Sequence, residues 1–357
     1  MLTDGNNPAS ASATVEAAPA TCPAWLLQAW QQARTAGASD LFLISGHQPR
    51  LRVLGRLVTP PELPCSPLPP WAGLAATLGL TANNALATGK AAGQIEGVLE
   101  HPALGRARWS LARQQHGLML VLRLLPEQVP TLADVQLDAA QAALVERSNG
   151  LLLVTGATGS GKSCTLAALV QHWRERHGGH VVTLEDPVEL RYPELPGLVS
   201  QRDVASDCIS YAEGLRAALR QDPDLILIGE LRDRDSARLA LAAAETGHLV
   251  LATLHTASAI GAMDRLLGLF PGDERELARG QLADTLIAVM SQQLLPCAGG
   301  RRAVREILVA TAAIRHLIRE HRLNQIESVM QTGQEAGMQT WAQALQNAGL
   351  PEGSEPG

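Results

Sequence analysis

Aromatic residues and positive charge are both scarce in this sequence. Only 3% of its 357 residues are aromatic although 46% are hydrophobic, so a buried core has to be built mainly from Leu, Ala and Val. The formal net charge is −6. A general nucleic-acid binder carries a basic surface, so this charge argues against that class and predicts no specific nucleic-acid partner.

Paired cysteines and long apolar stretches are missing as well. The five cysteines include no Cys-x-x-Cys pair, which argues against a zinc site or a disulfide framework and fits a reducing compartment. No apolar stretch approaches the roughly 18 residues of a membrane span, and the N-terminus lacks a basic segment followed by an apolar one. We therefore expect a soluble, cytoplasmic protein, which leaves docking to a membrane complex open.

A glycine-rich loop is the most informative feature that the sequence does contain. Residues 156–163 read Gly-Ala-Thr-Gly-Ser-Gly-Lys-Ser and directly follow the apolar run 151–154. This is the phosphate-binding loop pattern, in which a strand leads through a glycine-rich turn to a lysine, a hydroxyl and a helix. The helix-forming stretch here is 166–176. The placement of the loop between a strand and a helix predicts nucleotide binding.

Each residue type in this loop has a chemical reason to be there. Gly156, Gly159 and Gly161 let the backbone turn so that its N–H groups point at a triphosphate. Lys162 is expected to reach the β- and γ-phosphates, Ser163 to offer its hydroxyl to Mg²⁺, and the helix N-terminus to add partial positive charge. The predicted ATP-binding set is Gly156, Ala157, Thr158, Gly159, Ser160, Gly161, Lys162, Ser163 and Cys164.

Polar residues also stand at the ends of three other predicted strands. Glu230 follows the apolar run 225–229, Glu185 ends another strand, and His255 follows a third. Open α/β sheets place their ligands at the carboxyl ends of their strands, so these side chains should face the phosphate loop. Such a loop needs an acidic partner to hold Mg²⁺ or to polarise the attacking water. We predict Glu230 and Ser163 at the metal, with Glu185 and Glu230 as alternative bases.

The first half of the chain, residues 23–125, is predicted to be a small α+β domain. Residues 1–22 are poor in large apolar groups and are expected to be a disordered tail. A proline-rich loop is expected at 60–70 and an inter-domain linker at 126–136. The spacing of apolar residues predicts one helix, at 25–36, and four strands, at 40–44, 50–54, 106–112 and 119–125.

The second half, residues 137–350, is predicted to alternate strands with helices. Strongly apolar strands in this arrangement imply a mainly parallel sheet covered on both faces, which is an α/β fold. The expected strands are 151–155, 181–185, 225–229 and 249–253. Three further helices are expected over 311–320, 323–332 and 341–347, before a tail at 351–357.

Together these motifs resemble those of the type II/IV secretion ATPase superfamily. Residues 185–189, Glu-Asp-Pro-Val-Glu, look like its aspartate box, and Glu230 within 229–233 looks like its Walker B glutamate. His255 within 253–256, Thr-Leu-His-Thr, looks like its histidine box. The resemblance spans roughly residues 38–345. It implies a RecA-like P-loop NTPase domain with a smaller N-terminal α+β domain of PAS-like fold.

Two features resemble the pilus-retraction branch of that superfamily, the twitching-motility or PilT-type ATPases. Residues 313–320, Ala-Ile-Arg-His-Leu-Ile-Arg-Glu, look like the C-terminal helix signature of retraction motors, with His316 in place of the usual asparagine. The four-cysteine zinc insertion and the long extra N-terminal domain of assembly and secretion relatives are not found in this sequence. The resemblance implies a cytoplasmic ATPase that drives pilus retraction at the periphery of the inner membrane.

The resemblance also implies a homohexameric ring in which ATP lies between subunits. Arginines from a neighbour's N-terminal domain reach the γ-phosphate in such rings, and those that match here are Arg106, Arg108 and Arg123. Another family arginine corresponds to His116, with Arg113 as a candidate substitute; imidazole lacks the fixed donors of a guanidinium. Cys164 stands where the family usually has threonine, and we interpret it as an inert buried thiol.

In the mechanism implied by this resemblance, His255 senses the γ-phosphate and connects its presence to the subunit interface. The linker after Pro126 lets the two domains change angle between nucleotide states. The expected partners are further copies of the chain, an inner-membrane pilus platform protein and a paralogous retraction ATPase.

Three alternatives remain at this stage. The first is a secretion or pilus-extension ATPase. The second is an accessory ring subunit that binds nucleotide but mainly assists another motor, which the changes at His116, Cys164 and His316 keep open. The third is a DNA-transfer ATPase of conjugation or competence, for which a stronger basic patch is expected.

Overall fold

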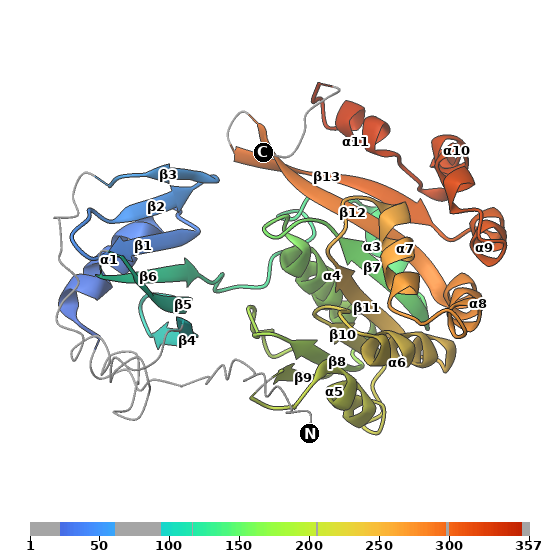
Figure 1. Ribbon diagram of the computed structural model, residues 1–357, viewed down its shortest axis with the longest axis horizontal. Helices are drawn as coiled ribbons and strands as arrows, with labels where there is room; N and C mark the ends of the chain where they lie inside the picture. The colour runs from blue at the N-terminus through green and yellow to red at the C-terminus, as the bar shows by residue number, and fades with distance from the viewer. Residues whose placement is uncertain (1–21, 61–93, 116, 205, 298–299, 352–357) are drawn as a thin grey trace, which may run out of the picture. The chain divides into compact units, whose positions relative to one another are not determined.

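The computed structural model describes residues 22–60, 94–115, 117–204, 206–297 and 300–351. Most of the predicted proline-rich loop, His116 and nearly all of both predicted tails lie outside these residues. The chain divides into two compact units between Glu127 and Gln128 (Figure 1). Nowhere in the described ranges is there a helix with the length and hydropathy needed to cross a membrane.

The first unit is an antiparallel sheet of six strands with a helix packed on it. The strand order is β3-β2-β1-β6-β5-β4. Leu26 and Trp30 of the helix share one buried cluster with Leu41 and Trp109 of the sheet. The elements are α1 (Ala24–Thr35), β1 (Asp40–Ile44), β2 (Arg50–Val53), β3 (Arg56–Val58), β4 (Gln94–His101), β5 (Gly105–Gln114) and β6 (Gly117–Leu124).

The second unit contains a sheet of seven strands in the order β13-β12-β7-β11-β10-β8-β9. Every neighbouring pair is parallel except β12 with β13, so the prediction of a mainly parallel sheet is confirmed. The strands are β7 (Gly150–Thr155), β8 (His180–Glu185), β9 (Leu198–Asp203), β10 (Leu225–Ile228), β11 (Leu249–Leu254), β12 (Leu286–Cys297) and β13 (Gly300–Val309).

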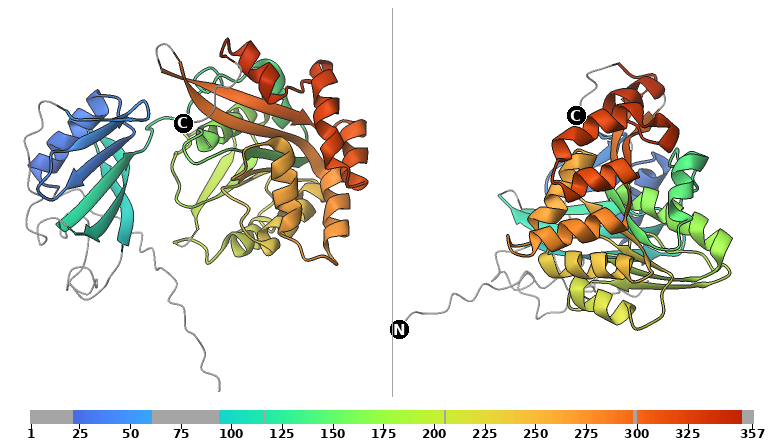
Figure 2. Two further views of the ribbon diagram at one scale, coloured as in Figure 1. Left: turned by 45° about the horizontal axis from the view of Figure 1, so that its top comes forward. Right: turned by 90° about the vertical axis from the view of Figure 1, so that its right-hand side faces the viewer.

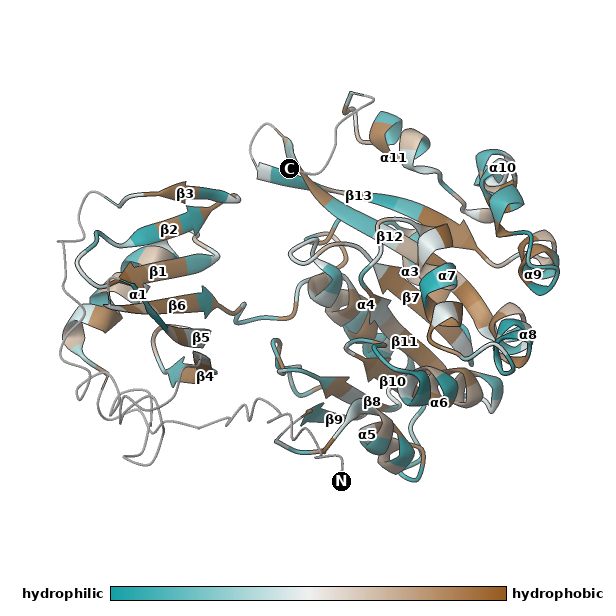
Figure 3. Cartoon of the chain, viewed as in Figure 1, coloured by the Kyte–Doolittle hydropathy of each residue, from teal (hydrophilic) through white to brown (hydrophobic). Residues whose placement is uncertain are grey.

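Both faces of this sheet are buried because its central strands carry apolar residues on both sides. On β7, Leu151 and Leu153 face one cluster while Leu152 and Val154 face the other. Figure 3 shows these strands as the apolar centre of the unit, and Figure 2 shows the helices around them. Helix α4 (Lys162–His177) packs on one face. The other face is covered by α5 (Tyr211–Ala218), α6 (Arg234–Glu245), α7 (Ala259–Gly268), α8 (Arg275–Thr285) and α9 (Ala312–Arg319).

Two predicted helices need a correction. The helix after the phosphate loop begins at Lys162 rather than Leu166, because the loop ends at Gly161 in a left-handed conformation and the helix starts directly after it. The segment expected to be one helix over 323–332 is a 3-10 turn, η3 (Leu323–Gln325), followed by α10 (Ile326–Thr332). Helices α9 and α11 (Trp341–Asn347) confirm the two others, and Thr311 and Thr340 cap their N-termini.

The helix with the retraction-like signature holds the start of β12 in place. Arg315 on α9 donates hydrogen bonds to the carbonyl oxygens of Ala310 and Leu286, at 3.1 and 2.8 Å. It also donates to those of Ala283 and Asp284 at the end of α8, at 2.5 and 2.6 Å. Carbonyls at a helix C-terminus lack partners within the helix, and a guanidinium supplies several donors to them at once. The signature arginine is therefore a structural link between α8 and β12.

Candidate functional site

The glycine-rich loop connects the end of β7 to α4 and has a backbone that requires glycine. Gly156 and Gly161 have φ values of 145° and 87°, which residues other than glycine rarely adopt. A Cβ atom on Gly156 would clash with the backbone oxygen of Gln292. The same β12 residue therefore limits what can occupy the first position of the loop. Ala157, Thr158 and Gly159 are exposed at the opening of the loop.

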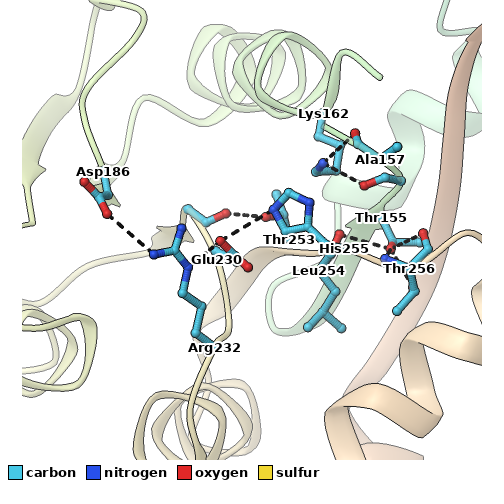
Figure 4. Close-up of polar contacts among 12 residues, drawn as sticks. Thr155, Ala157, Lys162, Asp186, Glu230, Arg232, Thr253, Leu254, His255 and Thr256 are labelled. Carbon is cyan, nitrogen blue, oxygen red and sulfur yellow. Dashed lines mark hydrogen bonds and ion pairs between the residues drawn. The ribbon is translucent and has the colours of Figure 1, made fainter. Parts of the chain in front are cut away.

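Lys162 lies inside this loop rather than in solvent. It is 8% exposed, and its Nζ donates to the backbone oxygens of Gly156 at 2.8 Å and Ala157 at 3.0 Å (Figure 4). Burial lowers the pKa of this ammonium, while Glu230 and Glu189 act in the opposite direction. The lysine is thus pre-positioned at the point where loop amides and helix α4 converge.

The next two residues of α4 differ in accessibility. Ser163 is exposed in the first turn, where its hydroxyl can reach a metal ion. Cys164, which the sequence analysis interprets as an inert buried thiol, is half-buried, and burial raises the pKa of its thiol. Ser160, on the loop itself, has a buried hydroxyl oxygen with no hydrogen-bond partner among the described residues.

The strand order brings Glu230 and His255 to the same edge as the loop. Strand β11 lies between β7 and β10, so His255 after β11 is the neighbour of both. His255 Nε2 is 3.5 Å from Glu230 Oε2. Thr155, the last residue of β7, donates through Oγ1 to the backbone oxygen of Thr256 at 2.8 Å and accepts from its N–H at 2.9 Å. The end of β7 and the histidine segment are therefore held together (Figure 4).

Arg232 is a site residue that the sequence analysis did not single out, although it lies in the motif 229–233. Its Nε donates to Glu230 Oε2 at 2.5 Å, and Nη1 lies 3.8 Å from Asp186 Oδ2 (Figure 4). The hydrogen bond to Glu230 raises the pKa of Arg232. The pair orients the Glu230 carboxylate and links it to the acidic segment after β8.

Glu185 lies one strand further along the sheet and has different partners. Its Oε1 accepts from Thr183 Oγ1 at 2.7 Å and from Gln201 Nε2 at 3.2 Å. Burial nevertheless raises the pKa of this carboxyl above the ordinary value of glutamate. A carboxyl with a raised pKa accepts a proton more readily near neutral pH, which is the property that a general base requires.

The three predicted arginines lie in the first unit, on one face of its sheet. Arg108 and Arg123 are direct cross-strand neighbours on β5 and β6, and Arg106 is two residues from Arg108 on the same strand. Arg108 pairs with Glu96 at 2.8 Å and Arg123 with Asp40 at 3.0 Å. Because side chains alternate along a strand, Arg113 belongs to the opposite face. It is therefore not placed beside these three arginines.

The residues at this site fit a nucleoside triphosphate. The loop is shaped by glycines that cannot carry a Cβ, a lysine ammonium is held inside it, and the buried Ser160 hydroxyl has hydrogen-bonding capacity left over. Glu185, Glu230 and His255 lie at the carboxyl ends of β8, β10 and β11, at the same edge of the sheet. Such a set of groups can bind a polyphosphate, hold a divalent cation and accept a proton from water.

Comparisons with known proteins identify relatives of this chain. Residues 106–350 match the family model described as type II/IV secretion system protein. The chain is 48% identical over 256 residues to protein YggR of Escherichia coli (strain K12), covering 71% of this chain and 78% of that protein. It is 44% identical over 242 residues to the type IV pilus retraction ATPase PilT of Pseudomonas aeruginosa, covering 68% and 70% of the two chains.

The structural comparison extends over both units. The crystal structure of the pilus retraction motor PilT with bound ADP superposes with a TM-score of 0.78 at 36% sequence identity. The match covers 90% of this chain and 92% of that one.

Proposed function

This chain belongs to the type II/IV secretion system protein family, and we propose that it is an ATP-hydrolysing motor that powers retraction of a type IV pilus. The observation that carries the proposal is the meeting of the phosphate loop, Glu230 and His255 at one edge of the sheet. The likeness over both units to a retraction motor with bound ADP supports it.

In the proposed reaction, the loop amides and Lys162 hold the phosphates of ATP. Lys162 Nζ exchanges its contacts with the Gly156 and Ala157 carbonyls for phosphate oxygens. Ser163 and Glu230 would hold Mg²⁺, which when bound neutralises charge on the β- and γ-phosphates. His255, 3.5 Å from Glu230, is placed to sense the γ-phosphate.

The proton of the attacking water goes to a carboxylate. The water oxygen attacks the γ-phosphorus, the bond to the β-phosphate oxygen breaks, and the base takes the proton. We assign Glu185 as this base, because its pKa is raised by burial while Glu230 is engaged by Arg232. Glu230 then remains available to the metal ion and to His255.

We propose a RecA-like ATPase unit and a PAS-like first unit, which the strand order of the first sheet supports. The motor is a homohexamer in which Arg106, Arg108 and Arg123 of a neighbour reach the γ-phosphate. It works in the cytoplasm at the inner membrane, on a pilus platform protein and alongside a paralogous retraction ATPase.

Replacing Glu185 with Gln is expected to lower kcat by about 10²- to 10⁴-fold, the usual contribution of a general base.

The change from Glu185 to Gln should also raise the free energy of unfolding at neutral pH. Between the ordinary glutamate pKa of the unfolded chain and the raised pKa of the folded protein, the folded state binds more protons. The free energy of unfolding of the unaltered protein therefore falls as pH rises through this window.

Thermal unfolding of E185Q checks this second effect. Its midpoint should exceed that of the unaltered protein at neutral pH, and the difference should become small below about pH 3, where the glutamate is protonated in both the folded and the unfolded state. E194Q, at an exposed glutamate, is the matched control and should show neither effect. A fully active E185Q would remove Glu185 from the mechanism and leave Glu230 as the base.

A deletion strain tests the biological role. Loss of a retraction motor is expected to leave long or numerous pili, whereas loss of an extension ATPase leaves none. A purified chain that assembles into rings but turns over little ATP by itself would favour the accessory role.

A further inference from the structure

The hairpin β12–β13, at one edge of the seven-stranded sheet, carries two adjacent polar pairs. Ser291 lies opposite Glu306 and Gln292 opposite Arg305 in the register of the two strands. Ser291 Oγ donates to the Ala257 oxygen at 2.9 Å, and Glu306 Oε2 accepts from the Ala259 N–H at 2.6 Å. This first pair holds the segment that follows His255. The second pair faces the phosphate loop.

Gln292 is in contact with the loop through both its backbone and its side chain. Its backbone oxygen lies close to where a Cβ atom on Gly156 would be, and its Nε2 donates to the backbone oxygen of Ser160 at 2.6 Å. Its Oε1 accepts from Thr165 on α4 at 2.7 Å and from Arg305 Nε at 2.8 Å. The side chain is 1% exposed, so these contacts are its whole hydrogen-bonding environment among the described residues.

Arg305 extends the network to the first turn of the second unit. It is 4% exposed, and burial lowers its pKa to about 10. Its Nη1 donates to the Gln136 oxygen at 2.9 Å, and its Nη2 donates to the Val135 oxygen. Gln136 has a φ of 56°, a left-handed conformation that costs free energy in a residue other than glycine. Contacts with Arg305 and with the Ala303 N–H, which donates to Gln136 Oε1 at 3.1 Å, hold it there.

We infer that Gln292 and Arg305 are positioning residues that couple the phosphate loop to the turn 131–137, which lies near the start of the second unit. The inference rests on the proposed function, because it concerns nucleotide bound at the same loop. A nucleotide that moves the Ser160 carbonyl shifts Gln292, and Gln292 and Arg305 share a hydrogen bond. The hydrogen bonds that Arg305 donates to the carbonyl oxygens of Val135 and Gln136 then become weaker or stronger.

The buried position makes this coupling strong. Hydrogen bonds to a charged guanidinium in a low-dielectric interior cost more to break than exposed ones, and an unpartnered buried donor is unfavourable. Each member of the network therefore keeps its partners only when the others stay in place. Val135, Gln136 and Leu137 donate their N–H groups within the turn, so their amide exchange with solvent reports its opening.

Amide hydrogen exchange of the full chain, with and without Mg²⁺ and a non-hydrolysable ATP analogue, tests the inference. Nucleotide should slow exchange at 156–163 and change it at 131–137 in the unaltered protein. In R305M the effect at 156–163 should persist while the response at 131–137 is lost. We also expect R305M to raise KM for ATP by about fivefold or more, the usual lower range of coupling between sites.

Two further variants keep the test decisive. R302M changes an exposed arginine on the same strand that donates to the Ala348 oxygen, and it should behave like the unaltered protein. Q292E keeps an acceptor for Arg305 and Thr165 but cannot donate to Ser160, so it should uncouple the turn even if R305M does not fold.

The results separate the inference from the function. Slowing at 156–163 without any response at 131–137 in the unaltered protein, or an undiminished response in Q292E, overturns the inference alone. No slowing at either segment overturns the proposed function and the inference with it.

Discussion

Replacing Lys162 with Ala is expected to lower kcat/KM for ATP hydrolysis by at least about 10²- to 10³-fold, the usual cost of removing one donor that stabilises charge in a transition state. Lys162 is buried in the loop and already makes two hydrogen bonds with loop carbonyls. Its ammonium is therefore oriented before the substrate arrives. Release of inorganic phosphate from ATP with Mg²⁺ measures the effect.

The composition of the chain offers a matched control for this variant. Only two of its 29 Lys and Arg residues are lysines, and the other one is Lys90. K90A should keep full turnover. K162R should be nearly as impaired as K162A, because a planar guanidinium does not replace a compact ammonium between two carbonyls. A K162A protein with near-normal turnover would contradict the site.

Replacing Glu230 with Gln is expected to lower kcat by about 10²-fold or more while leaving nucleotide binding largely intact. Glutamine has nearly the same shape and can still accept the hydrogen bond from Arg232, so the loss is that of the negative charge. In the proposed reaction that charge holds Mg²⁺. The change isolates the chemical step from binding of the phosphates.

Steady-state kinetics on E230Q, with KM and kcat determined separately, checks this expectation. E276Q, at an exposed glutamate on α8, serves as the control and should match the unaltered protein. If E230Q lost affinity for ATP but kept kcat, Glu230 would be a binding residue, and the assignment of its role in hydrolysis would be wrong.

The part of the site that could be predicted from sequence is the part encoded locally. The glycine-rich loop, its lysine and the apolar runs before Gly156, Glu230 and His255 are contiguous patterns, so their strands and the edge they share follow directly. Strands β7, β10 and β11 are apolar on both faces, which marks them as central. The expected mainly parallel sheet follows from that pattern.

The part that could not be predicted depends on contacts between distant segments. In strand β9, Leu198 is exposed and the other residues are half-buried. In strand β12, Ser291 and two glutamines interrupt the apolar residues. Neither sequence therefore has the pattern of apolar residues that marks a core strand. Gln292 and Arg305 are far from the phosphate loop in sequence. Their burial beneath it results from the pairing of β12 with β7, which no local pattern indicates.

Calorimetric titration of the full chain with a non-hydrolysable ATP analogue and Mg²⁺ tests the central claim most directly. The account predicts saturable binding in the unaltered protein and strongly weakened binding in K162A, with K90A unchanged. An unaltered protein that takes up no nucleotide, or a K162A variant that binds it equally well, would contradict the account.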